Sequence, residues 1–261
     1  MTRPNIIKII CHDIGKHLGC YGVKSVSTST IDSLAKEGIL FNNAFATSPG
    51  CSPSRAAIAT GRYPHNTGVL GLAHAHFGWS LDKKIKHIAK YFSSNDYNSI
   101  LFGLQHVTYN EETLGFNKIF PERPADHVIK NIEDNIDTIL FKKPFYAEVN
   151  FFEPHRPFDF GGVKSYRSKG VFIPKYIPNN FNIKKEFEAM QGAIKKMDES
   201  VGKIINLLKK KNLYENTIII FTTDHGIPFP RAKGTLYDAG IECSLITVSY
   251  THLTLPTKRI V

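Results

Sequence analysis

Short apolar runs alternate with helical segments along this chain, and this alternation constrains the fold more than any other feature. Runs typical of buried strands occupy residues 5–11, 39–47, 99–103, 145–152 and 217–222. Segments with helical periodicity and capping signals occupy residues 31–36, 54–60, 82–92, 125–140 and 184–211. Mostly apolar strands separated by helices indicate a mainly parallel sheet sandwiched by helices. We therefore predict an α/β fold.

The composition is that of an ordinary globular protein. At 261 residues, 42% hydrophobic and 21% charged, the chain can bury one sizeable core. Its four cysteines form no CxxC pair and no dense framework, which favours a reducing compartment. The apolar run at residues 6–11 is too short for a signal segment or a membrane span. We expect a cytoplasmic protein without a membrane partner.

The net charge of +10 favours a polyanionic partner, either nucleic acid or a sulfated glycan. Many of the lysines, however, fall in helical segments at 184–185, 195–196 and 209–211, where a solvated helix face is the ordinary interpretation. No motif of interleaved basic and aromatic residues is present. We expect no nucleic-acid partner.

Polar residues follow each predicted strand at its carboxyl end. Ligands of parallel sheets bind outside these ends, so the loops that follow the strands should converge on one site. A single histidine or aspartate there would more often be structural, and only the shared position makes the set informative. The set comprises His12 and Asp13, Cys51 and Arg55, Gln105 and His106, Glu153 to Arg156, and Asp224 to Gly226.

Cys51 lies in the most informative of these loops. It precedes Pro53 and Arg55 at a predicted helix start. Backbone N–H groups and a nearby arginine create a positive field there, which suits an anionic substrate. The alternative is a small, half-buried cysteine in a turn.

The pattern Cys51-x-Pro53-x-Arg55 resembles the signature of the sulfatase family. The resemblance is closest to the branch that contains heparan N-sulfatase and extends from about residue 5 to about residue 246. It implies an alkaline-phosphatase-like catalytic domain over residues 1–246. The further stretches that carry it are residues 12–15, 18–22, 61–66, 153–157 and 222–230.

The resemblance also implies roles for individual residues. Cys51 would be oxidised to formylglycine by a formylglycine-generating or radical maturation enzyme, and the hydrated aldehyde would supply the nucleophilic oxygen. Arg55 matches the arginine that steadies this hydrate. His155 matches a substrate-side histidine that would protonate the leaving group, and His106 matches a histidine of the family's Lys-x-His element. Lys233 falls where the family has a cation that touches the sulfate.

A metal site is implied as well. Asp13, Asp224 and modified Cys51 match the family's ligands directly, while His12 and His225 occupy positions that are usually Asp and Asn or Asp. Calcium prefers oxygen ligands, whereas imidazole favours zinc or manganese. Either the two histidines lie beside the ion or the preferred metal has shifted. We expect a Ca²⁺ site, with Zn²⁺ or Mn²⁺ as the alternatives. The alternative is that Asp13 and Asp224 have only a structural role and stabilise turns.

Two features depart from the family pattern. Leu104 or Gln105 takes the place of the lysine near His106, and we expect a C-terminally truncated fragment that lacks the smaller C-terminal subdomain implied by the resemblance. Residues 247–261 no longer resemble the family and look like translated sequencing-adapter read-through. We therefore predict that this segment is an artefactual tail that packs poorly.

The sequence thus predicts hydrolysis of a sulfuric ester or sulfamate in a sulfated small molecule or glycan. One alternative is a phosphodiesterase or phosphonate monoester hydrolase, which shares the architecture. The other is an inactive anion-binding remnant.

Overall fold

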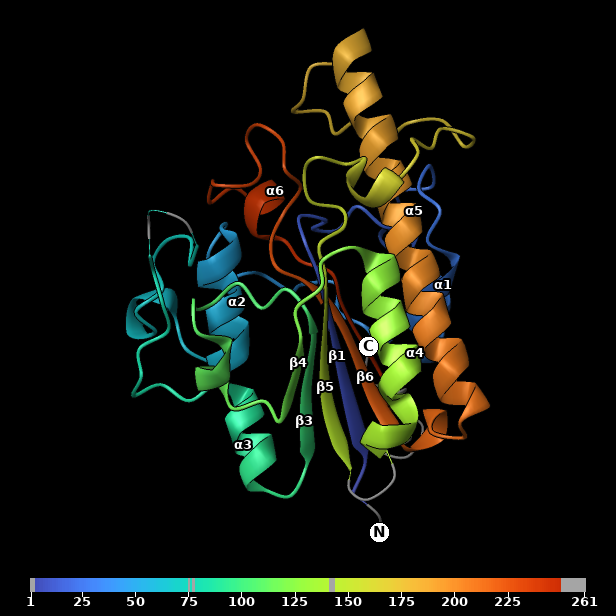
Figure 1. Ribbon diagram of the computed structural model, residues 1–261. Helices are drawn as coiled ribbons and strands as arrows, with labels where there is room; N and C mark the ends of the chain where they lie inside the picture. Colours follow the sequence, from blue (N-terminus) through green and yellow to red (C-terminus); the bar gives the residue numbers. More distant parts are fainter. Residues whose placement is uncertain (1–2, 75, 77, 141–143, 250–261) are drawn as a thin grey trace.

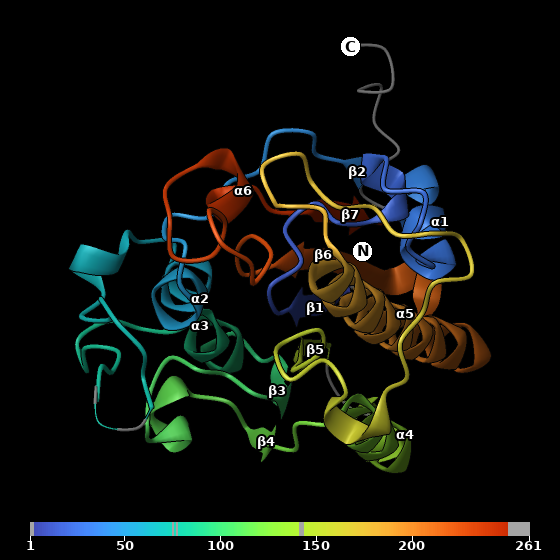
Figure 2. The same ribbon diagram turned by 90° about the horizontal axis from the view of Figure 1, so that it is seen from above.

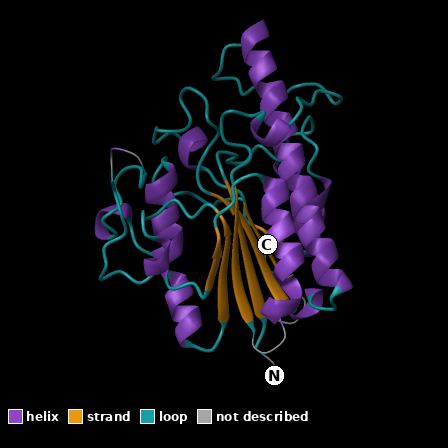
Figure 3. Ribbon diagram, viewed as in Figure 1, coloured by secondary structure: helices purple, strands orange, loops and turns teal. Residues whose placement is uncertain are grey.

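A computed structural model describes residues 3–249, except 75, 77 and 141–143. The described chain folds into a seven-stranded sheet with helices on both faces (Figures 1 and 3). The strands lie in the order β2-β7-β6-β1-β5-β3-β4. Their bounds are β1 Asn5–Cys11, β2 Ile39–Leu40, β3 Asn98–Gly103, β4 Lys118–Phe120, β5 Phe145–Phe151, β6 Thr217–Thr223 and β7 Leu245–Val248.

Strand β1 lies at the centre and pairs in parallel with β5 and β6. Beyond β5, strands β3 and β4 continue the parallel arrangement. At the other edge β7 runs antiparallel to β6, and β2 runs antiparallel to β7. The predicted mainly parallel sheet is therefore confirmed.

The helices form two layers. Helices α1, α4 and α5 cover one face of the sheet, and α2 and α3 cover the other (Figures 1 and 2). None of the helices in the described part of the chain has the length and apolar character needed to cross a membrane. Their bounds are α1 Ser29–Glu37, α2 Cys51–Thr60, α3 Ile88–Ser94, α4 Ala125–Leu140, α5 Phe181–Lys210 and α6 Asp238–Ile241.

The main hydrophobic core lies between the sheet and α1, α4 and α5. Ile7 and Ile9 of β1 belong to one buried cluster with Met190 and Met197 of α5. A small separate cluster, which includes Ala56 of α2, lies outside this core. The predicted two-sided burial of the central strands therefore holds, with most of the apolar packing on one face.

Two predicted elements are shorter in the structure than the sequence indicated. Only Ile39–Leu40 of the expected strand 39–47 pairs in the sheet, and the turn-forming pair Asn42-Asn43 follows almost at once. The helix expected at 82–92 begins only at Ile88. Asp82 instead accepts a hydrogen bond from the Lys84 backbone in a turn, and His87 caps α3 by accepting from the Ala89 N–H.

The predicted non-family tail begins inside the sheet. Thr247 and Val248 belong to β7, and Val248 is buried. Poor packing is therefore a wrong prediction for these two residues, because the hydrogen bonds of β7 to β6 and β2 include them. Residues 250–261 of that tail lie outside the described residues.

Candidate active site

Strands β1 and β6 bring two acidic side chains together. The strands end side by side, and the Asp224 N–H donates to the Cys11 carbonyl. The Asp13 N–H donates to Asp224 Oδ1 at 3.0 Å. Asp13 has a φ of 53°, a left-handed conformation that Asp tolerates better than most residues and that turns the chain sharply after β1. Both carboxylates are fully buried.

Helix α2 brings Cys51 and Arg55 to the same point. The helix begins at Cys51 itself, earlier than the predicted start at residue 54, so the thiol lies at the helix N-terminus. Cys51 Sγ is 4.0 Å from Asp13 Oδ1. One turn later Arg55 Nε donates to Asp224 Oδ2 at 3.0 Å, and between them the Ser54 hydroxyl donates to the Asp224 carbonyl. The sequence prediction missed this contact of Ser54.

The two histidines at the strand ends are also fully buried. His225 Nδ1 lies 2.9 Å from the Gly226 carbonyl, which can only accept, so Nδ1 carries a proton. His225 Nε2 then lies 3.1 Å from Asp13 Oδ1 and 3.2 Å from Cys51 Sγ. His12 Nδ1 lies 3.0 Å from Asp224 Oδ2. A Cβ atom at Gly226 would be 1.8 Å from the Ala239 carbonyl oxygen, so only glycine fits there.

Lys233 and His155 lie at the mouth of the site. Lys233 Nζ is 2.8 Å from Asp13 Oδ2 and 3.0 Å from Oδ1. His155 Nε2 is 3.9 Å from Asp13 Oδ2. Both side chains are 28% exposed, unlike the buried members of the site. They line an open cavity of about 370 Å³ together with Asp13, Arg156, Pro228, Phe229 and Pro230.

His106 reaches the site from the loop after β3. Its φ of 63° is left-handed, and its Nε2 lies 2.5 Å from His74 Nδ1. Gln105, predicted with it, does not reach the site. Its side-chain oxygen accepts from the Val107 and Thr108 N–H groups and so shapes the loop. The sequence prediction missed His74, which lies between predicted elements where no periodicity points to it.

The charges of the site shift several pKa values. Burial raises the pKa of the Cys51 thiol, but the four histidines around it outweigh burial and bring this pKa well below 9.0. Burial likewise raises the pKa of Asp224, and His225, His12 and Arg55 reverse the effect. Burial lowers the pKa of His225, yet Asp224 and Cys51 raise it to about 9. The site therefore favours an ionised Asp224 carboxylate and a thiolate at Cys51.

The donor atoms fit a divalent metal ion. His12, Asp13, Cys51 and Asp224 each offer one ligand atom within 4.8 Å of the others. Ligands of an ion bound at about 2.1 Å lie about 3 to 4.2 Å apart, so small shifts would suffice. Neither ring nitrogen of buried His12 makes a well-formed hydrogen bond within the described residues. Such a side chain is expected where a further partner binds.

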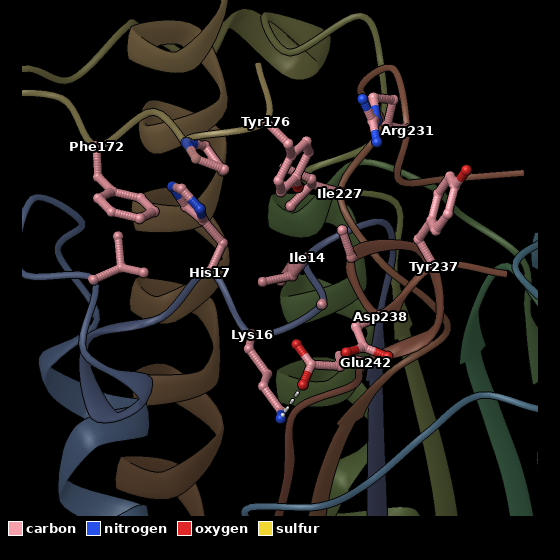
Figure 4. A pocket seen from close by; sticks show the side chains of 14 residues that line it. Ile14, Lys16, His17, Phe172, Tyr176, Ile227, Arg231, Tyr237, Asp238 and Glu242 are labelled. Carbon is pink, nitrogen blue, oxygen red and sulfur yellow. Dashed lines mark hydrogen bonds and ion pairs between the residues drawn. The ribbon is translucent and has the colours of Figure 1, made fainter. Parts of the chain in front are cut away.

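A larger cavity of about 520 Å³ lies beside the site (Figure 4). Lys16 and Glu242 form an ion pair at 2.8 Å in its wall, and Tyr176, Tyr237 and Arg231 also line it. It contains none of the predicted catalytic or metal-binding side chains. The loop 227–233 contributes to both cavities, but only the smaller one opens onto Asp13.

The fold and the site define an alkaline-phosphatase-like α/β protein. Buried acidic groups at the ends of parallel strands face a side chain at a helix N-terminus, where an anion is favoured. The family model for sulfatases matches residues 4–249. This chain belongs to the sulfatase family.

Named relatives and solved structures agree with this assignment. Human N-sulphoglucosamine sulphohydrolase is 27% identical over 96% of this chain and 56% of its own length. An ulvan-active sulfatase of Formosa agariphila is 30% identical over 94% of this chain and 48% of its own. The structure of the phosphonate monoester hydrolase of Agrobacterium radiobacter superposes with a TM-score of 0.74 at 20% identity, covering 96% and 69% of the two chains, and shows the shared fold. The chain spans about half the length of these curated relatives.

Proposed function

We propose that the protein hydrolyses a sulfuric ester or sulfamate, using a formylglycine derived from Cys51 and a divalent metal ion. The observation that carries this proposal is the position of Cys51 Sγ, 4.0 Å from Asp13 and 3.2 Å from His225, at the start of α2. A metal ion held by Asp13 and Asp224 would polarise the sulfate oxygens. The formylglycine would supply a hydroxyl nucleophile in place of the thiol.

Arg55 and the start of α2 form the anion-binding side of the site. Arg55 Nη2 makes no hydrogen bond within the described residues, so one buried donor is available to a substrate oxygen. The backbone N–H groups at the start of α2 add a positive field. Together they would stabilise the negative charge on the transferring sulfuryl group.

Lys233, His155 and His106 surround the remaining side. Lys233 Nζ is part-exposed and lies next to Asp13, so it can reach a sulfate oxygen in the cavity. His155 Nδ1 donates to the Arg156 carbonyl, which directs Nε2 to the site, where the imidazolium form would give its Nε2 proton to the leaving group and become the neutral Nδ1–H ring. His106, held against His74, serves as a second positioning group.

A sulfated saccharide is the substrate class that the observations favour. The names of two relatives specify N-sulphoglucosamine and ulvan as their substrates. The net charge of +10 also favours a polyanion over a neutral compound.

The test begins with protein produced together with a formylglycine-generating enzyme. A peptide mass across residues 50–62 should show the thiol replaced by an aldehyde. Such protein should hydrolyse an aryl sulfate or N-sulfoglucosamine faster than an aryl phosphodiester. Cys51→Ala should abolish turnover with little change in unfolding temperature, whereas Cys20→Ala, at a half-buried cysteine whose backbone N–H donates to Asp32, should keep it.

Two outcomes would contradict the proposal. Full activity in Cys51→Ala would remove the nucleophile. Preferential cleavage of the phosphodiester would instead assign the site to the phosphodiesterase class.

A further inference from the structure

We infer that the site selects a transition-metal ion of the Zn²⁺ or Mn²⁺ type over Ca²⁺, because imidazole nitrogens of His225 and His12 belong to its ligand set. This inference rests on the proposed metal-dependent function and specifies its ion. It replaces the Ca²⁺ expected from the sequence. The reason is that both histidines are buried among the carboxylate ligands instead of lying outside them.

His225 is oriented as a metal ligand. Its Nδ1–H is fixed on the Gly226 carbonyl, which directs Nε2 toward Asp13 Oδ1 at 3.1 Å, Cys51 Sγ at 3.2 Å and Asp224 Oδ1 at 3.7 Å. A backbone carbonyl that holds one ring nitrogen sets the tautomer and leaves the other nitrogen for the ion. The three neighbours of Nε2 are themselves the other expected ligands.

His12 supplies the second imidazole. Its ring is fully buried, and Nδ1 lies 3.0 Å from Asp224 Oδ2 without the geometry of a hydrogen bond. His12 belongs to both groups of side chains that can hold one ion, the first with Asp13, Cys51 and Asp224, the second with Cys51 and His106. Neither ring nitrogen makes a hydrogen bond within the described residues. Burying such a ring costs free energy unless a ligand such as a metal ion binds to one of its nitrogens.

The donor chemistry decides between the ions. Calcium takes six to eight oxygen ligands, whereas imidazole binds zinc and other borderline ions well. Two carboxylates, two imidazoles and the group at position 51 make a mixed nitrogen and oxygen set. Such a set offers Ca²⁺ too few oxygens, and it suits a smaller ion with fewer ligands.

The experiment compares metals in protein whose mass shows formylglycine at position 51, because an unmodified thiolate would itself favour zinc. Metal-free protein is titrated with Zn²⁺, Mn²⁺ and Ca²⁺ by calorimetry. Wild type should bind Zn²⁺ at least about tenfold more tightly than Ca²⁺. The double variant His12→Asp, His225→Asn restores the residues implied by the family resemblance and should reverse this preference.

Pulsed electron paramagnetic resonance of the Mn²⁺-loaded protein reports directly on coordinated nitrogen. Wild type should show ¹⁴N coupling from imidazole, and His225→Asn should weaken it. His87→Asn, which removes another buried imidazole, the N-cap of α3, should leave the coupling unchanged. A Cys51→Ser protein, with an oxygen at that position, should keep both the coupling and the preference for zinc.

The outcomes separate the two proposals. Tight Mn²⁺ binding without ¹⁴N coupling, or tighter binding of Ca²⁺ by wild type, overturns the inference and leaves a metal-dependent hydrolase intact. Failure to bind any of the three metals overturns the inference and the proposed function together.

Discussion

Two buried charge clusters lie on the same sheet and are built differently. The strand-end cluster consists of His12, Asp13, Arg55, Asp224, His225 and Lys233. The mid-sheet cluster consists of Lys8, His87, Tyr146, Glu148 and Asn150. Both place ionised groups where burial would be costly without partners.

The mid-sheet cluster is closed around one carboxylate. Lys8 and Glu148 are direct partners in the β1–β5 register, with Nζ 2.9 Å from Oε2. Tyr146 donates to Oε2 at 2.8 Å, and Asn150 donates to Oε1 at 3.1 Å. Glu148 therefore accepts on both oxygens and has one ammonium as counter-ion.

The strand-end cluster is open. Two carboxylates are shared among four cationic or imidazole groups, and Lys233 reaches a cavity. Arg55 Nη2 and the His12 nitrogens lack hydrogen bonds within the part of the chain that the structure describes. The comparison teaches that buried charge alone does not mark a functional site. A buried atom without a hydrogen bond does not mark one either, because Lys8 Nζ and Asn150 Oδ1 of the mid-sheet cluster also lack one within the described residues. The strand-end cluster differs in that its groups open onto a cavity.

The largest expected contrast is in activity. Asp224→Asn should lower kcat/KM at least about a thousandfold and abolish metal retention, because Asp224 joins the Asp13 backbone, Arg55 and His12. The Glu148→Gln variant should have nearly the kcat/KM of wild type at temperatures below its unfolding temperature. Steady-state kinetics and metal analysis measure both. Similar losses in the two variants would show that the clusters do not differ in function.

The next contrast is in stability. Glu148→Gln should lower the free energy of unfolding by about 3 kcal/mol, because it leaves the Lys8 ammonium buried without a counter-ion. Lys8→Met combined with Glu148→Met should recover most of that loss. Lys195→Ala breaks an exposed pair with Glu199 and should cost about 0.5 kcal/mol or less. Urea unfolding measures all three. If Glu148→Gln and Lys195→Ala lowered the free energy of unfolding equally, the buried ion pair of Glu148 would contribute no more to stability than the exposed pair.

The sequence predicted the sheet and the convergence of its loops because both depend on local patterns. Apolar runs identify β1, β5 and β6, and parallel strands bring their carboxyl ends to one edge. The structure accordingly brings Cys51, Asp13 and Asp224 together. Their chemical roles remain a prediction from the family resemblance.

The mid-sheet cluster escaped sequence analysis because it depends on register. Lys8 and Glu148 each interrupt an apolar run, and a charge inside a buried strand is a signal that a counter-ion lies nearby. Only the pairing of β1 with β5 identifies which one. The short strands β4 and β7 were missed for a similar reason, because three or four residues carry too little periodicity.

The pH dependence of stability should distinguish the mid-sheet pair from other groups. Burial alone would raise the pKa of Glu148, but Lys8 outweighs burial and lowers it from 4.5 to about 2. The unfolded chain therefore binds this proton first as the pH falls. The contribution of Glu148 is present above pH 4.5 and is lost toward pH 2, by up to about 3 kcal/mol. Unfolding curves of wild type and Glu148→Gln should converge across this range. A constant difference between them would contradict the lowered pKa.

The smallest effect tests whether the mid-sheet cluster is a network or a simple ion pair. Tyr146→Phe removes one buried donor to Glu148 Oε2 and keeps Lys8 at 2.9 Å from the same oxygen. The carboxylate keeps its ammonium partner in this variant. Losing the neutral hydroxyl donor should therefore lower the free energy of unfolding, measured with urea, by about 1 kcal/mol. In the Lys8→Met, Glu148→Met background the same substitution should cost less, because its acceptor is gone. An equal cost in both backgrounds would mean that the Tyr146 hydroxyl stabilises the protein independently of Glu148 and that the ion pair stands alone, because Phe keeps the ring that stacks on Phe92 at 4.4 Å.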